Sequence, residues 1–503
     1  MSLMRCARHS FTAVAAAALP AMLVLLFGGI ARAELTVVEN ADEKQGLTVF
    51  KMKVTPAAEP VPALKHRLTL REHELKPGNA ATHYLRAYPE GGVDATWKGL
   101  QKEYGEEEVH EWYDISTPIS KVPLDKARQA AGSFGSLINN FVARGSERLD
   151  CDWGHGIITE LRGVEIYGFL LPEIQSMRSI SRALMLVTRV AIADRDYDRA
   201  IDILRMNYRL GNDVAKSPFL VSGLVGLAIS GMGNAAVIEL IAAPASPNLY
   251  WAIAELPRPL ADLRTSFRHE FSFHTAVFPF MDRPEAANHS PEQWANLLAS
   301  ALQSVEPLVG SGPKLNELGA QLGVTGLALA GYGDAKQRLV ESGMTAAEVE
   351  AMPVGQVLAV DSAQEYRRLA DEVEKWGYVS AGQAQMHEDR IAKTLSGGPF
   401  EGGFGAALAR MLLPALQPAR NAQVRIDSQL NSLLVIEALR MHAAETGKLP
   451  ATLGEIAIVP VPDNPVTQLP YAYRLDGTTA VLELPFSKVS PNSAWRFEIT
   501  LAK

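Results

Sequence analysis

The segment LLVIEALRMHAAETGKLPATLGEI, residues Leu433–Ile456, decides the fold of the C-terminal part of the chain. Its apolar side chains recur at three- and four-residue steps, which predicts a helix. Gly447 follows the last periodic residue, where a helix commonly ends in a left-handed residue. The next stretch, VPDNPVTQLPYAYRL (Val461–Leu475), predicts a proline-rich turn that leads into a strand. Alternation of apolar and polar residues predicts strands at Tyr471–Leu475, Ala480–Leu484 and Arg496–Leu501.

The order of these elements resembles the globular part of type II secretion pseudopilins. The likeness rests on the helix, on G-x-L-P at Gly447–Pro450, on P-D-x-P at Pro462–Pro465 and on Tyr471-Ala472-Tyr473. It implies an α+β module over residues 423–503, in which the helix packs on a short antiparallel sheet. Pseudopilins carry a membrane helix directly before this module, whereas here residues 1–422 precede it. The likeness therefore covers the tail of the chain.

The first 33 residues have the pattern of a secretory signal peptide. Arg5 and Arg8 form a basic start, and the uncharged apolar run Phe11–Ile30 follows. Ala31-Arg32-Ala33 fits the rule for signal cleavage, so the mature chain is expected to begin at Glu34. We expect an exported protein, periplasmic or extracellular. A signal segment that remains as a membrane anchor is the alternative, because about 20 apolar residues can span a bilayer.

The charge balance argues against nucleic acid and against anionic membrane surfaces as partners. The 503 residues carry 48 basic and 56 acidic side chains, a formal charge of −8. Without the three arginines of residues 1–33 the balance is 45 to 56, or −11. Both excluded partners need clustered positive charge. Cys6 leaves with the signal segment and Cys151 remains alone, which excludes an intramolecular disulfide.

Composition and periodicity predict a mainly α protein with a helical-hairpin body, and they divide the chain into six parts. The expected parts are a signal peptide (1–33), a strand with a Pro/Ala linker (34–63), a helical-hairpin body (64–305), a second helical block (306–395), a flexible joint with a broken helix (396–422) and the α+β module (423–503).

The clearest hairpin lies in the body, where residues 172–193 and 197–214 each place apolar side chains on one helical face. Their junction, VAIADRDYDRAIDIL (Val190–Leu204), resembles the middle of a tetratricopeptide hairpin. The likeness implies that Tyr197 fills the turn and that small Ala200 lets the two helices cross closely. A weaker copy is expected 36 residues further on, with a turn at Gly231–Gly233.

Cys151-Asp152-Trp153-Gly154-His155 places the remaining thiol four residues before a histidine. A Cys–His pair can act as nucleophile and base when the imidazole reaches the sulfur. No family-specific signature accompanies Cys151 and His155, so we interpret the cysteine as a buried structural residue.

Two further groups have metal-ligand residue types. His269 and His274 stand five residues apart, whereas H-E-x-x-H places its histidines four apart on one helix face. Asp463, Asn464 and Asp476 flank the C-terminal turn and strand, where some pseudopilins hold calcium. Their spacing lacks the density of a calcium loop, and we interpret them as turn residues. No cofactor is expected, because phosphate-binding and dinucleotide motifs do not occur.

Several blocks together resemble an uncharacterised family of secreted proteins from planctomycete-type bacteria. The blocks are PALKHRLTLREHELKPGNAATHYLRA (Pro62–Ala87), CDW (Cys151–Trp153), LPEIQSMRSISRAL (Leu171–Leu184), SGLVGLAI (Ser222–Ile229), PNLYWAIAELPRPLADLR (Pro247–Arg264) and VEAMPVGQV (Val349–Val357). The resemblance implies export, a mostly helical body and a pseudopilin-like tail. It implies no activity and no catalytic residues.

The sequence favours a non-catalytic scaffold or protein-interaction component of the cell envelope, because helical arrays offer a continuous groove. Its expected partner is another protein. One alternative is a secreted hydrolase with a site in a cleft of the body, built from Cys151, His155, His269 or His274. Another alternative is an accessory of a pseudopilin-type secretion system. The oligomeric state does not follow from the sequence.

Overall fold

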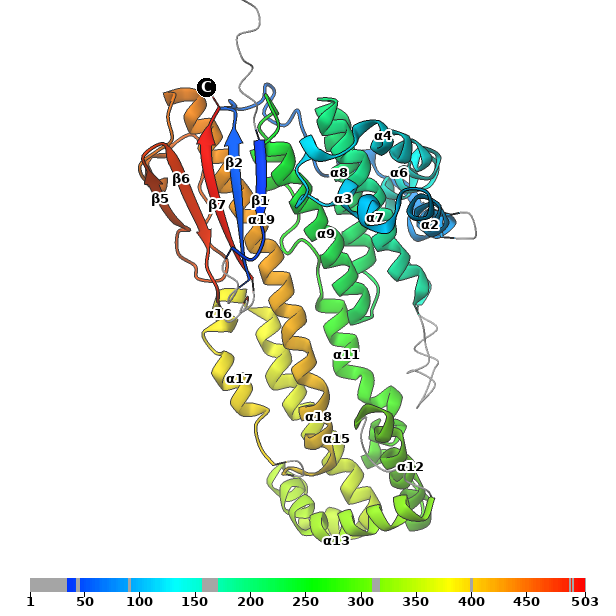
Figure 1. Cartoon of the computed structure of the whole chain (residues 1–503). Helices are drawn as coiled ribbons and strands as arrows, with labels where there is room; N and C mark the ends of the chain where they lie inside the picture. Colours follow the sequence, from blue (N-terminus) through cyan, green and yellow to red (C-terminus); the bar gives the residue numbers. More distant parts are fainter. Residues whose placement is uncertain are drawn as a thin grey trace, which may run out of the picture.

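The computed structural model describes residues 34–41, 46–88, 92–155, 171–309, 317–398, 401–487, 490 and 493–502. The predicted signal segment, with Cys6, lies outside the described residues. The protein is mainly helical, with a small sheet at one end. Figure 1 shows this sheet beside a layer of short helices at the upper end, while α12 and α13 lie at the lower end.

The sheet has the strand order β1-β2-β7-β6-β5. Its strands are β1 (Glu34–Val38), β2 (Leu47–Val54), β5 (Ala472–Asp476), β6 (Thr479–Leu484) and β7 (Ala494–Leu501). β2 and β7 pair in parallel, and the other neighbours pair antiparallel. Parallel strands need a crossover connection. Here the crossover from β2 to β7 contains the whole helical body.

This topology differs from the predicted tail module. The three strands expected in the tail are present, but two N-terminal strands complete their sheet. Phe50 of β2 stacks on Phe497 of β7 with ring centroids 5.0 Å apart, so the joint between the two ends of the chain is apolar and buried. The tail is therefore not a discrete unit, because a central strand of its sheet comes from the other end of the sequence.

Helix α19 (Leu416–Thr446) packs on this sheet, as predicted. It ends before Gly447, whose φ of +73° is the expected left-handed conformation. The apolar face of α19 is fully buried in one cluster with side chains of β6 and β7. The buried residues that α19, β6 and β7 contribute to this cluster include Leu430, Leu433, Ile436, Leu439, Ala480, Leu482, Phe497 and Ile499.

A buried ion pair in α19 connects the sheet to the body. Glu437 and Arg440 are both 0% exposed, and Arg440 Nη1 lies 2.9 Å from a Glu437 carboxylate oxygen. Arg440 also donates to the carbonyls of Thr55 (3.0 Å), just after β2, and Ser246 (2.7 Å), after α9. Glu437 accepts the backbone N–H of Leu249 at 3.1 Å. This pair of charges on α19 thus satisfies polar groups of two other chain segments, at Thr55 and at residues 246–249.

The centre of the body consists of α7 (Pro172–Ala193), α8 (Tyr197–Ala215) and α9 (Leu220–Ile241). The predicted first hairpin is present as α7 and α8. The predicted second hairpin is wrong, since α9 continues through Gly231 and Gly233, and tetratricopeptide-like repeats are not confirmed.

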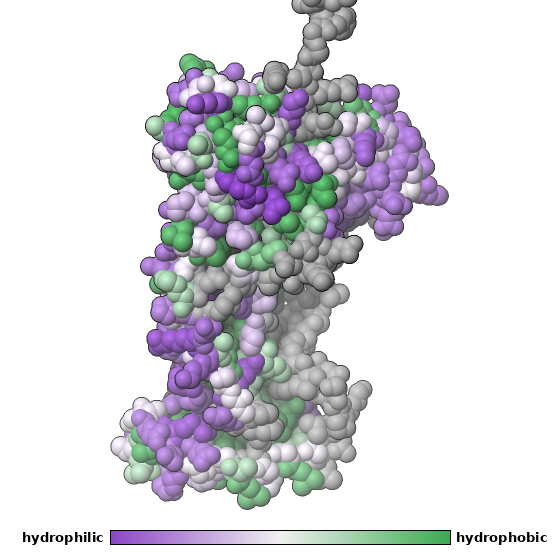
Figure 2. Space-filling view, turned by 60° about the vertical axis from the view of Figure 1, so that its left-hand side comes forward, coloured by the Kyte–Doolittle hydropathy of each residue, from purple (hydrophilic) through white to green (hydrophobic). Residues whose placement is uncertain are grey.

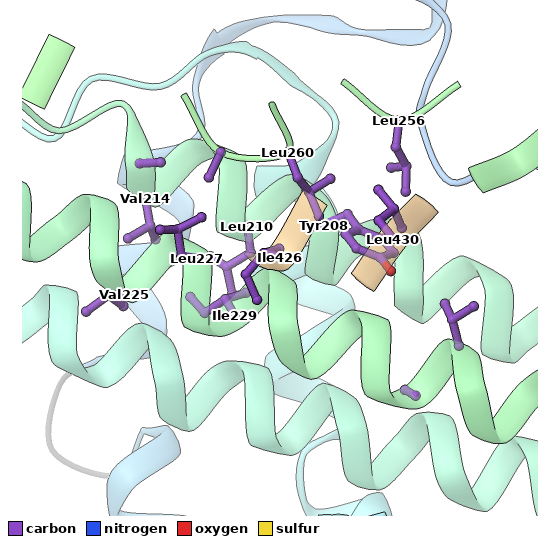
Figure 3. Packing of buried hydrophobic residues seen from close by; sticks show 14 of the residues in the cluster. Tyr208, Leu210, Val214, Val225, Leu227, Ile229, Leu256, Leu260, Ile426 and Leu430 are labelled. Carbon is purple, nitrogen blue, oxygen red and sulfur yellow. The ribbon is translucent and has the colours of Figure 1, made fainter. Parts of the chain in front are cut away.

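Close packing explains the glycines that the sequence assigned to a turn. A side-chain carbon at Gly233, one of these glycines, would lie 2.9 Å from Asn207 Nδ2 and 3.1 Å from the Tyr208 ring of α8, so a larger residue would have to displace them. Figure 3 shows the apolar side chains of α8 and α9 meeting Ile426 and Leu430 of α19. α9 is long and apolar enough to cross a membrane, and 72% of its most apolar window is buried inside the protein.

Short helices cover the outer face of α7 and α9. These are α1 (Ala81–Tyr84), α2 (Val93–Tyr104), α3 (Glu106–Tyr113), α4 (Leu124–Ser133), α5 (Gly135–Leu137) and α6 (Ala143–Ser146), with a two-stranded parallel ladder of β3 (Lys76–Asn79) and β4 (Arg148–Asp150). Buried Arg189 of α7 pairs with Glu239 of α9 at 2.8 Å and donates to the carbonyls of Trp112 and Asp114. This second buried pair holds the covering layer on the body.

The helices between α9 and α19 in the sequence vary in length, and α12 and α13 form the lower end. The helices of this stretch are α10 (Tyr250–Ala254), α11 (Arg264–Val277), α12 (Pro291–Val309), α13 (Glu317–Glu341), α14 (Ala346–Ala351), α15 (Val354–Glu374), α16 (Ala381–Gln385), α17 (Glu388–Thr394) and α18 (Gly403–Leu412). Thr345 and Glu348 form a capping box at the start of α14. Part of the expected joint at 396–422 forms α18, and α19 already begins at Leu416.

The crossing of α7 and α8 gives a testable prediction about Ala200, which is fully buried. Ala200→Trp should overpack this crossing and lower the free energy of unfolding by about 1–3 kcal/mol. Ala347→Trp places the same side chain on the exposed face of α14 and should leave stability nearly unchanged. Urea unfolding measures both variants, and equal stability of Ala200→Trp and the parent would contradict the described packing.

Asp427 of α19 gives a prediction about pH. Burial raises the pKa of Asp427 to about 6, although the N–H of Leu260 and the charge of Arg258 oppose the shift. In the unfolded chain the carboxyl titrates near pH 4. The group therefore favours folding most at or below about pH 4, and this contribution is lost as the pH rises through about 6.

Asp427→Asn removes this titration. Its free energy of unfolding, relative to the parent, should rise by on the order of 2 kcal/mol from about pH 4 to about pH 7. Exposed Asp463→Asn is the matched control and should show no such rise. Urea unfolding at both pH values tests this, and a constant difference between Asp427→Asn and the parent would exclude the buried ionisation.

Candidate functional site

Cys151 lies beside a buried aspartate on α8. Asp213 is fully buried, accepts a hydrogen bond from the Tyr84 hydroxyl (3.1 Å), and pairs with Arg209 and Lys216 at 2.9 Å each. Burial, and then the negative charge of Asp213, raise the pKa of the Cys151 thiol well above its usual range. A thiol in this environment stays protonated and is a poor nucleophile.

His155 does not approach Cys151 as a base; it lies between a hydroxyl and a carboxylate. Its Nδ1 is 2.8 Å from Ser217 Oγ, and its Nε2 is 3.1 Å from Glu173 Oε1. Ser217 follows the end of α8 and Glu173 is in the first turn of α7, so the α7–α9 arrangement positions both partners. The order hydroxyl–imidazole–carboxylate is that of an activated serine. Ser217 is 1% exposed.

The structure brings His155 and His269 to one aromatic ring and leaves His274 apart. The rings of His155 and His269 each lie 5.6 Å from the ring of Phe219. His274 instead stacks on Tyr366 at 3.9 Å, and burial lowers its pKa to about 4. Among the described residues no three histidine, cysteine or acidic side chains are grouped to hold a metal ion.

The three calcium-ligand candidates of the tail, Asp463, Asn464 and Asp476, have different local environments. The carboxamide oxygen of buried Asn464 accepts the N–H of Val466 at 2.9 Å, which is the expected turn role. Asp476 accepts a hydrogen bond from Arg474 Nε at 2.9 Å, at the end of β5. Asp463 is exposed beside Asn464.

A cavity of about 690 Å³ lies at the lower end, between α12, α13, α15 and the start of α18. Its volume is within the range of about 300–1,000 Å³ that is usual for small-molecule sites. The wall is mainly apolar and includes Leu298, Leu302, Val324, Leu358 and Phe404. Gly323, Gly326 and Gly331 of α13 contribute backbone instead of side chains, which widens the cavity.

Charged side chains also line part of this wall. Arg338 of α13 forms a bidentate ion pair with Asp361 of α15, with both nitrogen–oxygen distances at 2.8 Å. Asp334 and Glu401 line the cavity as well. Figure 2 shows hydrophobic residues exposed at this end of the molecule, and Leu322 and Leu329 of α13 are 64% and 85% exposed.

Sequence reasoning named Cys151 and His155 but missed Ser217, Glu173 and the cavity. Ser217 and the residues around it, His155, Phe219 and His269, come from separate parts of the sequence. The glycine-rich, uncharged stretch of residues 318–333 in α13 was the available signal for the cavity. It marks a helix that does not fill the space beside it.

Comparison of the chain with protein-family models, with curated proteins and with solved structures finds no match. The arguments about function therefore rest on the geometry of these two sites.

The environment of Cys151 predicts slow reaction with thiol reagents. In a Cys6→Ser chain, where Cys151 is the remaining thiol, the folded protein should react far more slowly than the same chain in urea. Labelling kinetics with a maleimide or an aromatic disulfide measure the two rates. Comparable rates, or rapid labelling of the folded chain below neutral pH, would show an activated thiol instead.

Proposed function

We propose that the chain is an exported, non-catalytic binding protein of the cell envelope that holds a predominantly apolar small molecule. The ligand occupies the cavity between α12, α13, α15 and α18. The observation that carries this proposal is the cavity itself, with a volume of about 690 Å³ and a mainly apolar wall. Apolar pockets with a few placed polar groups are the usual form of small-molecule sites.

The side chains at the wall favour binding over catalysis. Ser362 donates its hydroxyl to the carbonyl of Leu358 at 2.7 Å, and Asp361 is held by Arg338. No histidine or cysteine is among the described residues that line the cavity. A nucleophile with an adjacent base is what covalent catalysis requires.

Export is supported by the signal pattern of residues 1–33 and by the acidic balance of the rest of the chain. A binding function agrees with the non-catalytic role that the sequence favours, but its partner is a small molecule where the sequence predicted a protein. The upper end, with its sheet and covering helices, supports the lower helices through α9, α11, α15 and α19 (Figure 1).

A neutral apolar dye, N-phenyl-1-naphthylamine, tests the binding function. Its fluorescence should rise on addition of the folded protein, and n-alkanols should displace it. Each added methylene contributes about 0.8 kcal/mol when buried, so Kd should fall about fourfold per methylene until the chain fills the cavity. An absence of dye binding, or alkanol affinities that do not depend on chain length, would contradict the proposal.

Two glycines of α13 provide matched variants. Gly331 lines the cavity, whereas Gly333 is exposed and does not, and a side-chain carbon at either would meet no atom within 4 Å. Both replacements with leucine improve helix propensity by up to about 1 kcal/mol, so stability should not separate them. Gly331→Leu should weaken dye binding about tenfold by occupying the cavity, and Gly333→Leu should leave it unchanged. Equal binding by both variants would place the dye elsewhere.

A second candidate is acyl transfer at Ser217, favoured by the hydrogen-bonded order Ser217–His155–Glu173. In that function His155 Nδ1 would take the hydroxyl proton as the serine attacks an ester carbonyl, and Glu173 would stabilise the imidazolium. The exposure of 1% at Ser217 argues against it, because the attacking oxygen must reach a substrate.

A fluorophosphonate probe, which labels activated serines, separates the two functions. The binding function predicts no covalent labelling of the folded parent. Labelling that is lost in both Ser217→Ala and His155→Gln would support acyl transfer. Intact-protein mass spectrometry gives the result directly.

A further inference from the structure

Acidic side chains outnumber basic side chains at the cavity wall. The lining residues include three carboxylates, Asp334, Asp361 and Glu401, and one guanidinium, Arg338. The bidentate pair with Asp361 neutralises Arg338. Two carboxylates of the wall, Asp334 and Glu401, are then left to act on a ligand.

The charged groups near the cavity do not neutralise this excess of carboxylates. Glu365, which lies close to Gly402 at the start of α18, is paired with Arg368 at 2.9 Å. Arg410 is not among the lining residues and donates to the backbone carbonyls of Gly398 and Glu401, while the Glu401 carboxylate accepts the N–H of Gly398 at 3.0 Å. Burial raises the pKa of Asp361; Arg338 lowers it, and the negative charges of Glu365 and Asp334 raise it further. The lining residues of this wall thus carry a formal excess of negative charge, with three carboxylates against one guanidinium.

An anionic head group does not fit this wall. It would have to compete with Asp361 for Arg338, and Asp361 is only 3% exposed. Separating the two would leave a buried carboxylate without its partner, which is strongly unfavourable. A bare metal ion does not fit either, because the described carboxylates are not grouped at metal-ligand distances.

An aromatic ring lies next to the charged groups. The backbone at Gly403 is close to Asp361 and Arg338, and Phe404 follows it at the cavity wall. Phe278 holds the Phe404 ring in an edge-to-face contact with centroids 5.7 Å apart. Aromatic faces attract quaternary ammonium groups. The wall thus combines an apolar body, carboxylates and an aromatic ring.

From this arrangement we infer that the cavity binds a single-chain amphiphile whose head group is a cationic nitrogen. The apolar chain would lie against Leu298, Leu302 and Val324, and the head group would face Asp334 and Glu401. This inference rests on the proposed binding function and adds the charge of the ligand to it.

Three dodecyl amphiphiles that differ in head group test the inference. Dodecyltrimethylammonium, dodecanol and dodecyl sulfate are titrated below micelle-forming concentrations against the dye bound to the whole protein. The cation should bind at least about tenfold more tightly than the anion, with the alcohol between them. Added salt should reduce this ratio, because the carboxylates at the cavity mouth are partly exposed to solvent.

Charge variants locate the source of the preference. Asp334→Asn combined with Glu401→Gln should reduce the cation-to-anion ratio to within about threefold, with dodecanol affinity unchanged. Glu107→Gln is the matched control, since Glu107 is exposed on α3 at the other end of the molecule. It should leave the ratio unchanged although it alters the net charge.

Each outcome decides one question. Equal or tighter binding of the sulfate overturns the cationic ligand but leaves the apolar binding function intact. The cation preference could persist in the double variant Asp334→Asn/Glu401→Gln, or Glu107→Gln could reduce it as strongly as the double variant does. Either result would assign the preference to the overall negative charge of the protein and would also overturn the inference. Failure of all three amphiphiles and of the dye to bind contradicts the proposed function itself.

Discussion

The buried ion pair between Glu437 and Arg440 joins three parts of the fold that lie far apart in the sequence. Arg440 donates hydrogen bonds to the carbonyl of Thr55, where the chain leaves β2, and to the carbonyl of Ser246, after α9. Removing one member of a buried pair typically costs about 3–5 kcal/mol, because the other charge stays buried. The parallel pairing of β2 with β7 encloses the whole helical body between two adjacent strands. The position of the lower helices depends on this joint, since α19 carries the pair and runs down to them.

Sequence patterns over a few neighbouring residues predicted the helices, strands and helix ends that such residues determine. The periodicity of α7, α8 and α19, the left-handed Gly447 and the alternation in β5, β6 and β7 are properties of neighbouring residues. The partner of β7 could not be predicted in this way, because β2 lies hundreds of residues away and no periodicity encodes a parallel partner. The glycines of α9 were misassigned for a related reason. A glycine is equally compatible with a turn and with a close helix contact, and Gly233 of the predicted turn lies against Asn207 and Tyr208 of α8.

The two candidate sites likewise combine features that the local sequence predicts with contacts between distant residues that it does not. The sequence singled out His155, but its partners Ser217 and Glu173 come from the ends of two other helices. The cavity has no motif, because it arises where the glycines of α13 face α12, α15 and α18 without filling the space. Both observations fit a protein in which buried charges and histidines serve packing, while the open apolar volume lies at the end remote from the sheet. The proposed ligand matches the residues of the cavity wall, because its apolar chain fits the apolar side chains and its positive head group fits the carboxylates.

Hydrogen exchange of the whole protein, with and without dodecyltrimethylammonium, tests this account most directly. Exchange reports local opening, and a ligand slows it in the helices that it bridges. Bound amphiphile should slow exchange in α12, α13 and α18, and leave the strands and α7 to α9 unchanged. Slowed exchange at the sheet or around His155, or unchanged exchange in α13 while the amphiphile is bound, would contradict the assignment of the cavity as the binding site.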